Sequence, residues 1–100
     1  MTSISAKQLK ELLKDNSKDF QVIDVRTQLE WNEGHINDPR VINIEANSLL
    51  FNSNEVSKQK DVYVICESGG RSSFSQLILK TKGINSINVE GGMSDFRKLI

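Results

Sequence analysis

The fold class is decided by residues 61–73, DVYVICESGGRSS, where four consecutive apolar residues are followed by a cysteine, two glycines and an arginine. The apolar run predicts a strand over 61–65, with Cys66 at its carboxyl end, where the thiol should be reachable. After the loop, apolar residues fall on one helical face, and Gly83 is a typical helix terminator; the face comprises Phe74, Leu77, Ile78 and Thr81. The stretch therefore predicts a strand, a loop and a helix in succession.

The same alternation extends in both directions along the chain. On the amino-terminal side we expect, in order, a helix from the N-cap Ser5 to about Asp15, a strand over 21–26, a short helix and loop over 27–40, a strand over 41–44 and one or two helical turns within 45–52. On the carboxyl side a strand over 86–90 precedes a helix from about Met93. Such alternation predicts an α/β fold with a parallel sheet covered by helices on both faces. Ligands of these sheets gather at the carboxyl ends of the strands.

The composition is that of one compact domain over residues 1–100. Thirteen basic and thirteen acidic side chains balance, so we expect neither nucleic acid nor a membrane as a partner. Residues 1–16 carry charges through their apolar positions, unlike a signal peptide or a membrane span, and we expect a cytoplasmic protein. One cysteine and one histidine allow no intramolecular disulfide and lack the usual zinc ligands. We therefore expect a free thiol, with no metal and no cofactor.

The loop after Cys66 has the composition of an anion-binding site. Gly69 and Gly70 permit a tight turn with inward-facing backbone N–H groups, and the helix that follows from Arg71 or Ser72 adds its unpaired N–H groups. These dipoles favour the thiolate, so Cys66 should be a nucleophile that needs no histidine base.

The remaining polar residues near the strand ends are expected to have structural roles. His35 should satisfy a local backbone group, and Asp24 and Arg26 should brace each other. Arg71 can either bind an oxyanion or support the loop against an acidic neighbour such as Asp24.

Three segments resemble the motifs of rhodanese-like sulfurtransferase domains, in the order of that family. The loop resembles the family's active-site loop, a cysteine followed by four residues, an arginine and a small hydroxyl residue. Residues 23–36, IDVRTQLEWNEGHI, resemble its amino-terminal signature, and residues 89–96, VEGGMSDF, resemble its carboxyl-terminal motif. Together they span nearly the whole chain, so the resemblance is to one rhodanese-like domain.

The resemblance implies a five-stranded parallel sheet with helices on both faces and a sulfurtransferase of the thiosulfate sulfurtransferase type. A Cys66 thiolate would take a sulfane sulfur from thiosulfate or a persulfide, and a thiol or cyanide would remove it. Cys66 would be the catalytic residue, and the loop would bind the sulfur through Glu67, Ser68, Gly69, Gly70, Arg71 and Ser72. The partners would be a small-molecule sulfur donor, a thiol acceptor and a sulfur-trafficking protein.

Two other functions and one question of substrate stay open at this point. A non-catalytic module could use the fold for binding, regulation or sulfur relay, although intact Cys66 and Arg71 argue against an inactive domain. The related loop of cysteine phosphatases has one more residue between cysteine and arginine, so the shorter loop favours sulfur over phosphate or arsenate chemistry. Glu67 places a carboxylate beside the nucleophile and should disfavour the thiosulfate dianion. The physiological donor, the acceptor and the oligomeric state are not determined by the sequence.

Overall fold

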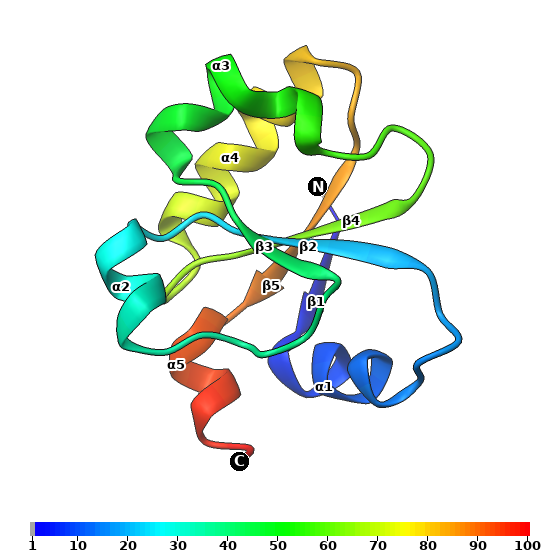
Figure 1. Cartoon of the computed structure of the whole chain (residues 1–100), viewed down its shortest axis with the longest axis vertical. Coiled ribbons are helices and arrows are strands. Elements are labelled where there is room, and N and C mark those ends of the chain that lie inside the picture. Colours follow the sequence, from blue (N-terminus) through cyan, green and yellow to red (C-terminus); the bar gives the residue numbers. More distant parts are fainter. Residues whose placement is uncertain (1) are drawn as a thin grey trace.

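The computed structural model describes residues 2–100, so Met1, the first residue of the expected domain, lies outside the described residues. Within them, five strands form one parallel sheet in the order β1-β5-β4-β2-β3 (Figure 1). The strands are β1 (Ser3–Ser5), β2 (Phe20–Asp24), β3 (Val41–Asn43), β4 (Asp61–Ile65) and β5 (Ser86–Glu90). The α/β class and the five-stranded parallel sheet are confirmed.

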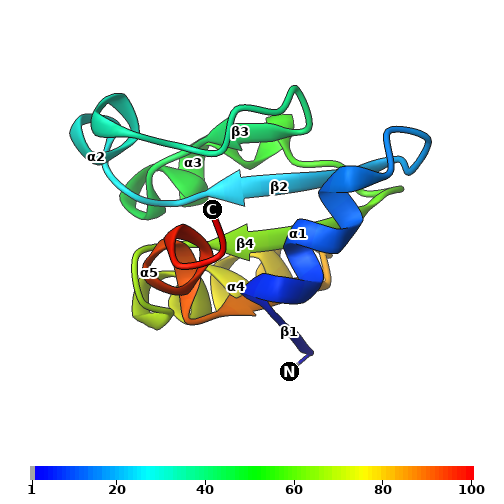
Figure 2. The same ribbon diagram turned by 90° about the horizontal axis from the view of Figure 1, so that it is seen from below.

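Helices cover both faces of this sheet (Figure 2). They are α1 (Ala6–Lys14), α2 (Gln28–Glu33), α3 (Leu49–Asn52), α4 (Gly70–Thr81) and α5 (Gly92–Arg97), with 3-10 turns at Ala46–Ser48 and Ser53–Glu55. Successive strand side chains point to opposite faces, so each strand contributes to two cores. One core lies under α1 and α5 and contains Leu9, Val22 and Phe96, whereas the other lies under α3 and α4 and contains Val64 and Leu79.

Two parts of the fold differ from what the residue pattern predicts. Strand β1 has three residues and is too short to show a pattern of its own. The expected apolar face of α4 is also wrong, because Phe74 and Leu77 are 57% and 52% exposed, while Leu79 and three polar residues are buried. The buried Gln76 explains the orientation of α4, since its Nε2 donates a hydrogen bond to the carbonyl of Ser86 at 2.9 Å. A polar face can therefore pack against the sheet when it matches the backbone groups there.

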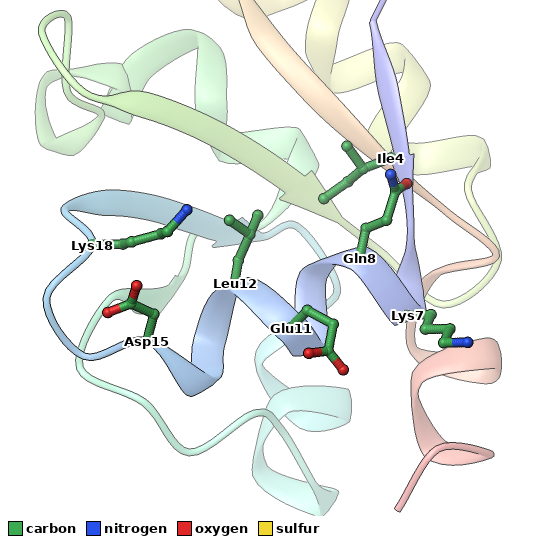
Figure 3. Close-up of a pocket in the computed structure, with 7 residues that line it drawn as sticks. All are labelled: Ile4, Lys7, Gln8, Glu11, Leu12, Asp15 and Lys18. Atoms are coloured by element: carbon green, nitrogen blue, oxygen red, sulfur yellow. The ribbon is translucent and has the colours of Figure 1, made fainter.

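A cavity of about 470 Å³ lies along α1, away from the loop that follows β4 (Figure 3). Ile4 and Leu12 form part of its wall, and Lys7, Glu11 and Lys18 lie among its charged lining residues. It contains none of the predicted site residues. Over residues 2–100, no helix has the length and apolar character needed to cross a membrane.

Candidate active site

Cys66 follows β4 directly, and its side chain lies on the sheet face covered by α3 and α4. Val62, Val64 and Cys66 alternate along the chain and belong to the same core. The residue is 1% exposed, so the expectation of an openly reachable thiol is wrong. The alternation that buries Val64 also turns the thiol inward, and the following loop folds over it.

The sulfur of Cys66 is surrounded by hydrogen-bond donors of its own loop. The amide of Gly69 donates to Sγ at 3.0 Å, and the hydroxyl oxygen of Ser72 lies 3.3 Å from Sγ. Burial raises the pKa of the Cys66 thiol, but the Ser72 hydroxyl and the amides of Ser72, Gly69 and Ser68 outweigh it, so the pKa lies below its usual value. Gly69 adopts a φ of 116°, which only glycine reaches without strain, and this conformation turns the amide to the sulfur.

The first turn of α4 adds further donors next to the sulfur. Gly69 is the N-cap of this helix, so the amides of Gly70 and Arg71 lie at its unpaired amino-terminal end. Neither amide donates a hydrogen bond to any group within residues 2–100. The N–H groups of Gly70 and Arg71 are therefore among those of the loop that can bind negative charge.

Ser72 connects the cysteine to Asn88 of the neighbouring strand β5. The Ser72 hydroxyl lies 2.5 Å from Oδ1 of Asn88 and 3.1 Å from the carbonyl oxygen of Gly69, so its single hydrogen has several acceptors, the sulfur among them. Asn88 pairs with Val64 in the sheet, which brings it close to the loop. Asn88 is not among the predicted site residues, and its signal in the sequence is a polar residue between two apolar ones in β5.

Helix α5 fixes the backbone on the cysteine side of the loop. The amides of Met93 and Ser94 donate to the carbonyl oxygens of Cys66 and Glu67 at 2.8 and 3.0 Å. Gly92 makes this approach possible, because a Cβ at its position would lie 2.3 Å from the Cys66 carbonyl oxygen. The second glycine of VEGGMSDF therefore has a structural reason that the sequence alone did not reveal.

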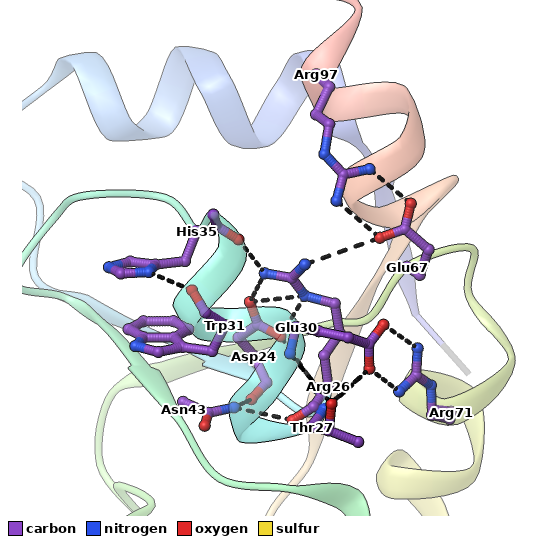
Figure 4. Close-up of polar contacts among 11 residues, drawn as sticks. Asp24, Arg26, Thr27, Glu30, Trp31, His35, Asn43, Glu67, Arg71 and Arg97 are labelled. Atoms are coloured by element: carbon purple, nitrogen blue, oxygen red, sulfur yellow. Dashed lines mark hydrogen bonds and ion pairs between the residues drawn. The ribbon is translucent and has the colours of Figure 1, made fainter.

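The Glu67 side chain forms ion pairs with two arginines (Figure 4). Arg97 of α5 holds the carboxylate with two hydrogen bonds of 2.6 and 2.9 Å, and Nη1 of Arg26 lies 3.8 Å from it. The guanidinium of Arg97 is the main reason that the pKa of Glu67 lies below its usual value. Glu67 is therefore ionised, but the two arginines largely compensate its charge. The sequence around Glu67 does not reveal this compensation.

Arg71 braces the other side of the loop against α2. Its guanidinium donates two hydrogen bonds, of 2.6 and 3.0 Å, to the carboxylate of Glu30. This contact, opposed by burial, lowers the pKa of Glu30 to about 2. The expected acidic neighbour, Asp24, is not the partner, since Arg26 binds Asp24 through Nε at 3.0 Å and Nη2 at 2.8 Å.

The other residues of the amino-terminal signature have the expected structural contacts (Figure 4). Nδ1 of His35 lies 2.8 Å from the carbonyl oxygen of Trp31, and the two rings stack with centroids 3.7 Å apart. Asp24 and Arg26 brace each other, as predicted. Among the residues described, no group of three or more histidine, cysteine, aspartate or glutamate side chains is placed to hold a metal ion.

Comparison with known proteins identifies relatives of this arrangement. A family model described as "Rhodanese-like domain" matches residues 5–99. The putative sulfurtransferase YtwF of Bacillus subtilis is 34% identical over 90 residues, which cover 90% of this chain and 84% of that protein. The putative sulfur carrier protein YrkF of the same organism is 32% identical over 83 residues, or 82% of this chain, and the match spans only 44% of its length. The crystal structure of a rhodanese-like domain protein from Staphylococcus aureus superposes with a TM-score of 0.87 at 36% identity, covering 96% of this chain and 91% of that one.

Proposed function

Because the chain belongs to the rhodanese-like domain family, we propose that it is a sulfurtransferase that passes a sulfane sulfur through a Cys66 persulfide to a thiol or cyanide acceptor. The supporting observation is the position of the Cys66 sulfur, 3.0 Å from the Gly69 amide and beside the start of α4. We further propose that residues 1–100 form one such domain, which the family match over residues 5–99 supports.

In the first half of the proposed reaction, the Cys66 thiolate attacks the sulfane sulfur of the donor. With thiosulfate, the S–S bond of the donor breaks and sulfite leaves with the bonding electrons. The outer sulfur of the new persulfide carries the negative charge. The amides of Gly70 and Arg71, unused in the free protein, are the donors that this sulfur would engage, in the manner of an oxyanion hole.

In the second half, a nucleophilic acceptor attacks the outer sulfur and Cys66 leaves as a thiolate. The lowered pKa of Cys66 makes it a better leaving group and increases the share of thiolate available for attack. A reducing cytoplasm would keep this lone thiol free for the cycle. The proposed partners are a small-molecule donor such as thiosulfate or a persulfide, a thiol acceptor, and a sulfur-trafficking protein.

The similarity to a putative sulfur carrier protein favours one second candidate, a relay module that accepts sulfur and hands it on without turning over small molecules. A donor panel distinguishes the two functions. Thiosulfate, a small-molecule persulfide and a persulfidated cysteine desulfurase are each offered with cyanide, and thiocyanate is measured over time. Multiple turnovers with a small-molecule donor support the enzyme. Loading from the protein donor alone, without turnover of either small molecule, supports the relay and contradicts the enzyme.

A further inference from the structure

A pocket of about 200 Å³ adjoins the Cys66 loop and has no role in the proposed sulfur chemistry. It lies among α2, the residues that follow β2, the loop and α5 (Figure 4), and its lining residues are Arg26, Glu30, Glu33, Gly34, Glu67 and Arg97. It borders the loop at both ends, because Glu67 follows Cys66 and Glu30 holds Arg71. A ligand in this pocket therefore lies against residues that flank the loop.

Arg26 supplies a cationic edge to this pocket. Its side chain is 2% exposed, and Nε and Nη2 are bonded to Asp24 and to the carbonyl oxygen of Gly34. Nη1 forms no hydrogen bond within the described residues, and its contact is the ion pair with Glu67 at 3.8 Å. The N–H groups of Nη1 can donate to a closer acceptor than the Glu67 carboxylate, so this edge favours an anionic ligand group.

Glu33 supplies the opposite charge. Its side chain is exposed, and it has no hydrogen bond or ion pair to any residue from 2 to 100. The other two carboxylates of the pocket are each held by an arginine, Glu30 by Arg71 and Glu67 by Arg97. The pocket therefore offers one cationic edge with only a 3.8 Å ion pair and no hydrogen bond, and one carboxylate without an ion pair, which together match a zwitterion.

We propose that this pocket binds the ammonium and carboxylate groups of a small α-amino-acid thiol, with the carboxylate accepting from Arg26 Nη1 and the ammonium donating to Glu33. The pocket is smaller than the about 300–1,000 Å³ typical of sites for larger ligands, which suits a single amino acid. This inference rests on the proposed function, since it names the class of acceptor that discharges the Cys66 persulfide.

The transfer step requires no oxidant or reductant. The thiolate of the bound amino acid attacks the outer sulfur of the Cys66 persulfide, forming a new S–S bond. The old S–S bond breaks, and its electrons return to Cys66 as the thiolate. The amino acid leaves as its persulfide, with the total number of sulfane sulfurs unchanged.

The first test compares acceptors that lack one charged group. L-Cysteine carries both groups, cysteamine lacks the carboxylate, and 3-mercaptopropionate lacks the ammonium. The loss of one sulfur from persulfidated protein is followed by mass, and each rate is expressed relative to that of the wild type with the same thiol, which cancels differences in thiol reactivity. Glu33→Gln should slow discharge by L-cysteine and cysteamine about tenfold while leaving 3-mercaptopropionate unchanged.

Two further variants complete the kinetic test. Glu55→Gln, which removes an exposed carboxylate outside this pocket, should leave all three thiols unchanged. Arg26→Lys keeps the charge but removes Nη1, so it should slow L-cysteine and 3-mercaptopropionate and spare cysteamine. The Glu33 comparison stands by itself if Arg26→Lys does not fold. Equal effects of Glu33→Gln on all three thiols would overturn the proposal.

A binding measurement separates this inference from the proposed function. S-methyl-L-cysteine cannot accept sulfur, but it carries both charged groups, and its binding is followed by NMR in the unmodified protein. Shifts should concentrate at the amides of Glu33 and Gly34 and at the Nε–H of Arg26, and Glu33→Gln should weaken them. Such shifts without persulfide formation would leave the pocket intact and refute the sulfurtransferase, whereas the absence of these shifts would refute the pocket.

Discussion

Replacing Glu67 by glutamine tests how charge at the loop governs the choice of donor. The substitution keeps the size of the side chain and removes a carboxylate next to the nucleophile. The carboxylate is held by Arg97 at 2.6 Å and approached by Arg26 at 3.8 Å, so its loss leaves two guanidinium groups without this partner. We expect kcat/KM for thiosulfate, a dianion, to increase.

The size of the increase follows from Coulomb's law and from exposure. Two unit charges about 5 Å apart interact by roughly 3 kcal/mol at an effective dielectric constant near 20. The Glu67 side chain is 37% exposed, so solvent and salt reduce this value severalfold, to about 1 kcal/mol. That energy corresponds to an increase of about fivefold in kcat/KM.

The assay is steady-state formation of thiocyanate from thiosulfate and cyanide. Arg97→Gln should have the opposite effect, because it leaves the Glu67 carboxylate without its main counter-ion. Glu55→Gln, a remote exposed variant, should change nothing. The increase should shrink at about 1 M salt, where the screening length falls to about 3 Å. An unchanged or lower kcat/KM for Glu67→Gln at low salt would refute the electrostatic reasoning.

Three further predictions concern the elements that hold the loop. Gly92→Ala should lower the free energy of unfolding by about 3 kcal/mol, because its Cβ would lie 2.3 Å from a backbone oxygen, whereas Gly34→Ala, with no atom within 4 Å, should change it little in the same urea titration. Glu30→Gln should lower the free energy of unfolding by about 1.5 kcal/mol at pH 7. Because folding lowers the pKa of Glu30 from 4.5 to about 2, the difference in stability from the wild type should vanish as the pH falls through that range. A difference that stays constant with pH would contradict the ion pair. Asn88→Asp should raise the pKa of the Cys66 thiol, because an acceptor-only side chain draws the Ser72 hydrogen away from the sulfur. The pKa is measured from the rate of alkylation as a function of pH. An equal rise in a Ser72→Ala background would show that the charge acts directly on the thiol.

The sequence pattern predicts the elements that bury mainly apolar residues. The run 61–65 forms β4 with the predicted bounds, and the N-cap Ser5 begins α1 through a capping box with Gln8. The buried face of α4 was predicted wrongly because Gln76 and two serines are buried by specific hydrogen bonds, which hydrophobic periodicity does not register.

The candidate site likewise has features that local sequence predicts and contacts that it does not. The positions of Cys66 and the two glycines follow from local sequence, because a strand, a tight turn and a helix start are local features. The contacts of Glu67 with Arg97 and of Arg71 with Glu30 join residues 30 and 41 positions apart, and only the folded chain brings them together. Burial of the thiol likewise depends on the sheet face to which the Cys66 side chain points, which is the face of Val62 and Val64.

Intact-mass measurement after incubation with thiosulfate or a small-molecule persulfide tests whether Cys66 carries the transferred sulfur. We expect the wild-type protein to gain one sulfur atom, which a thiol reductant removes and which Cys66→Ala does not gain. If no donor adds sulfur, or if Cys66→Ala gains it equally, Cys66 is not the sulfur carrier.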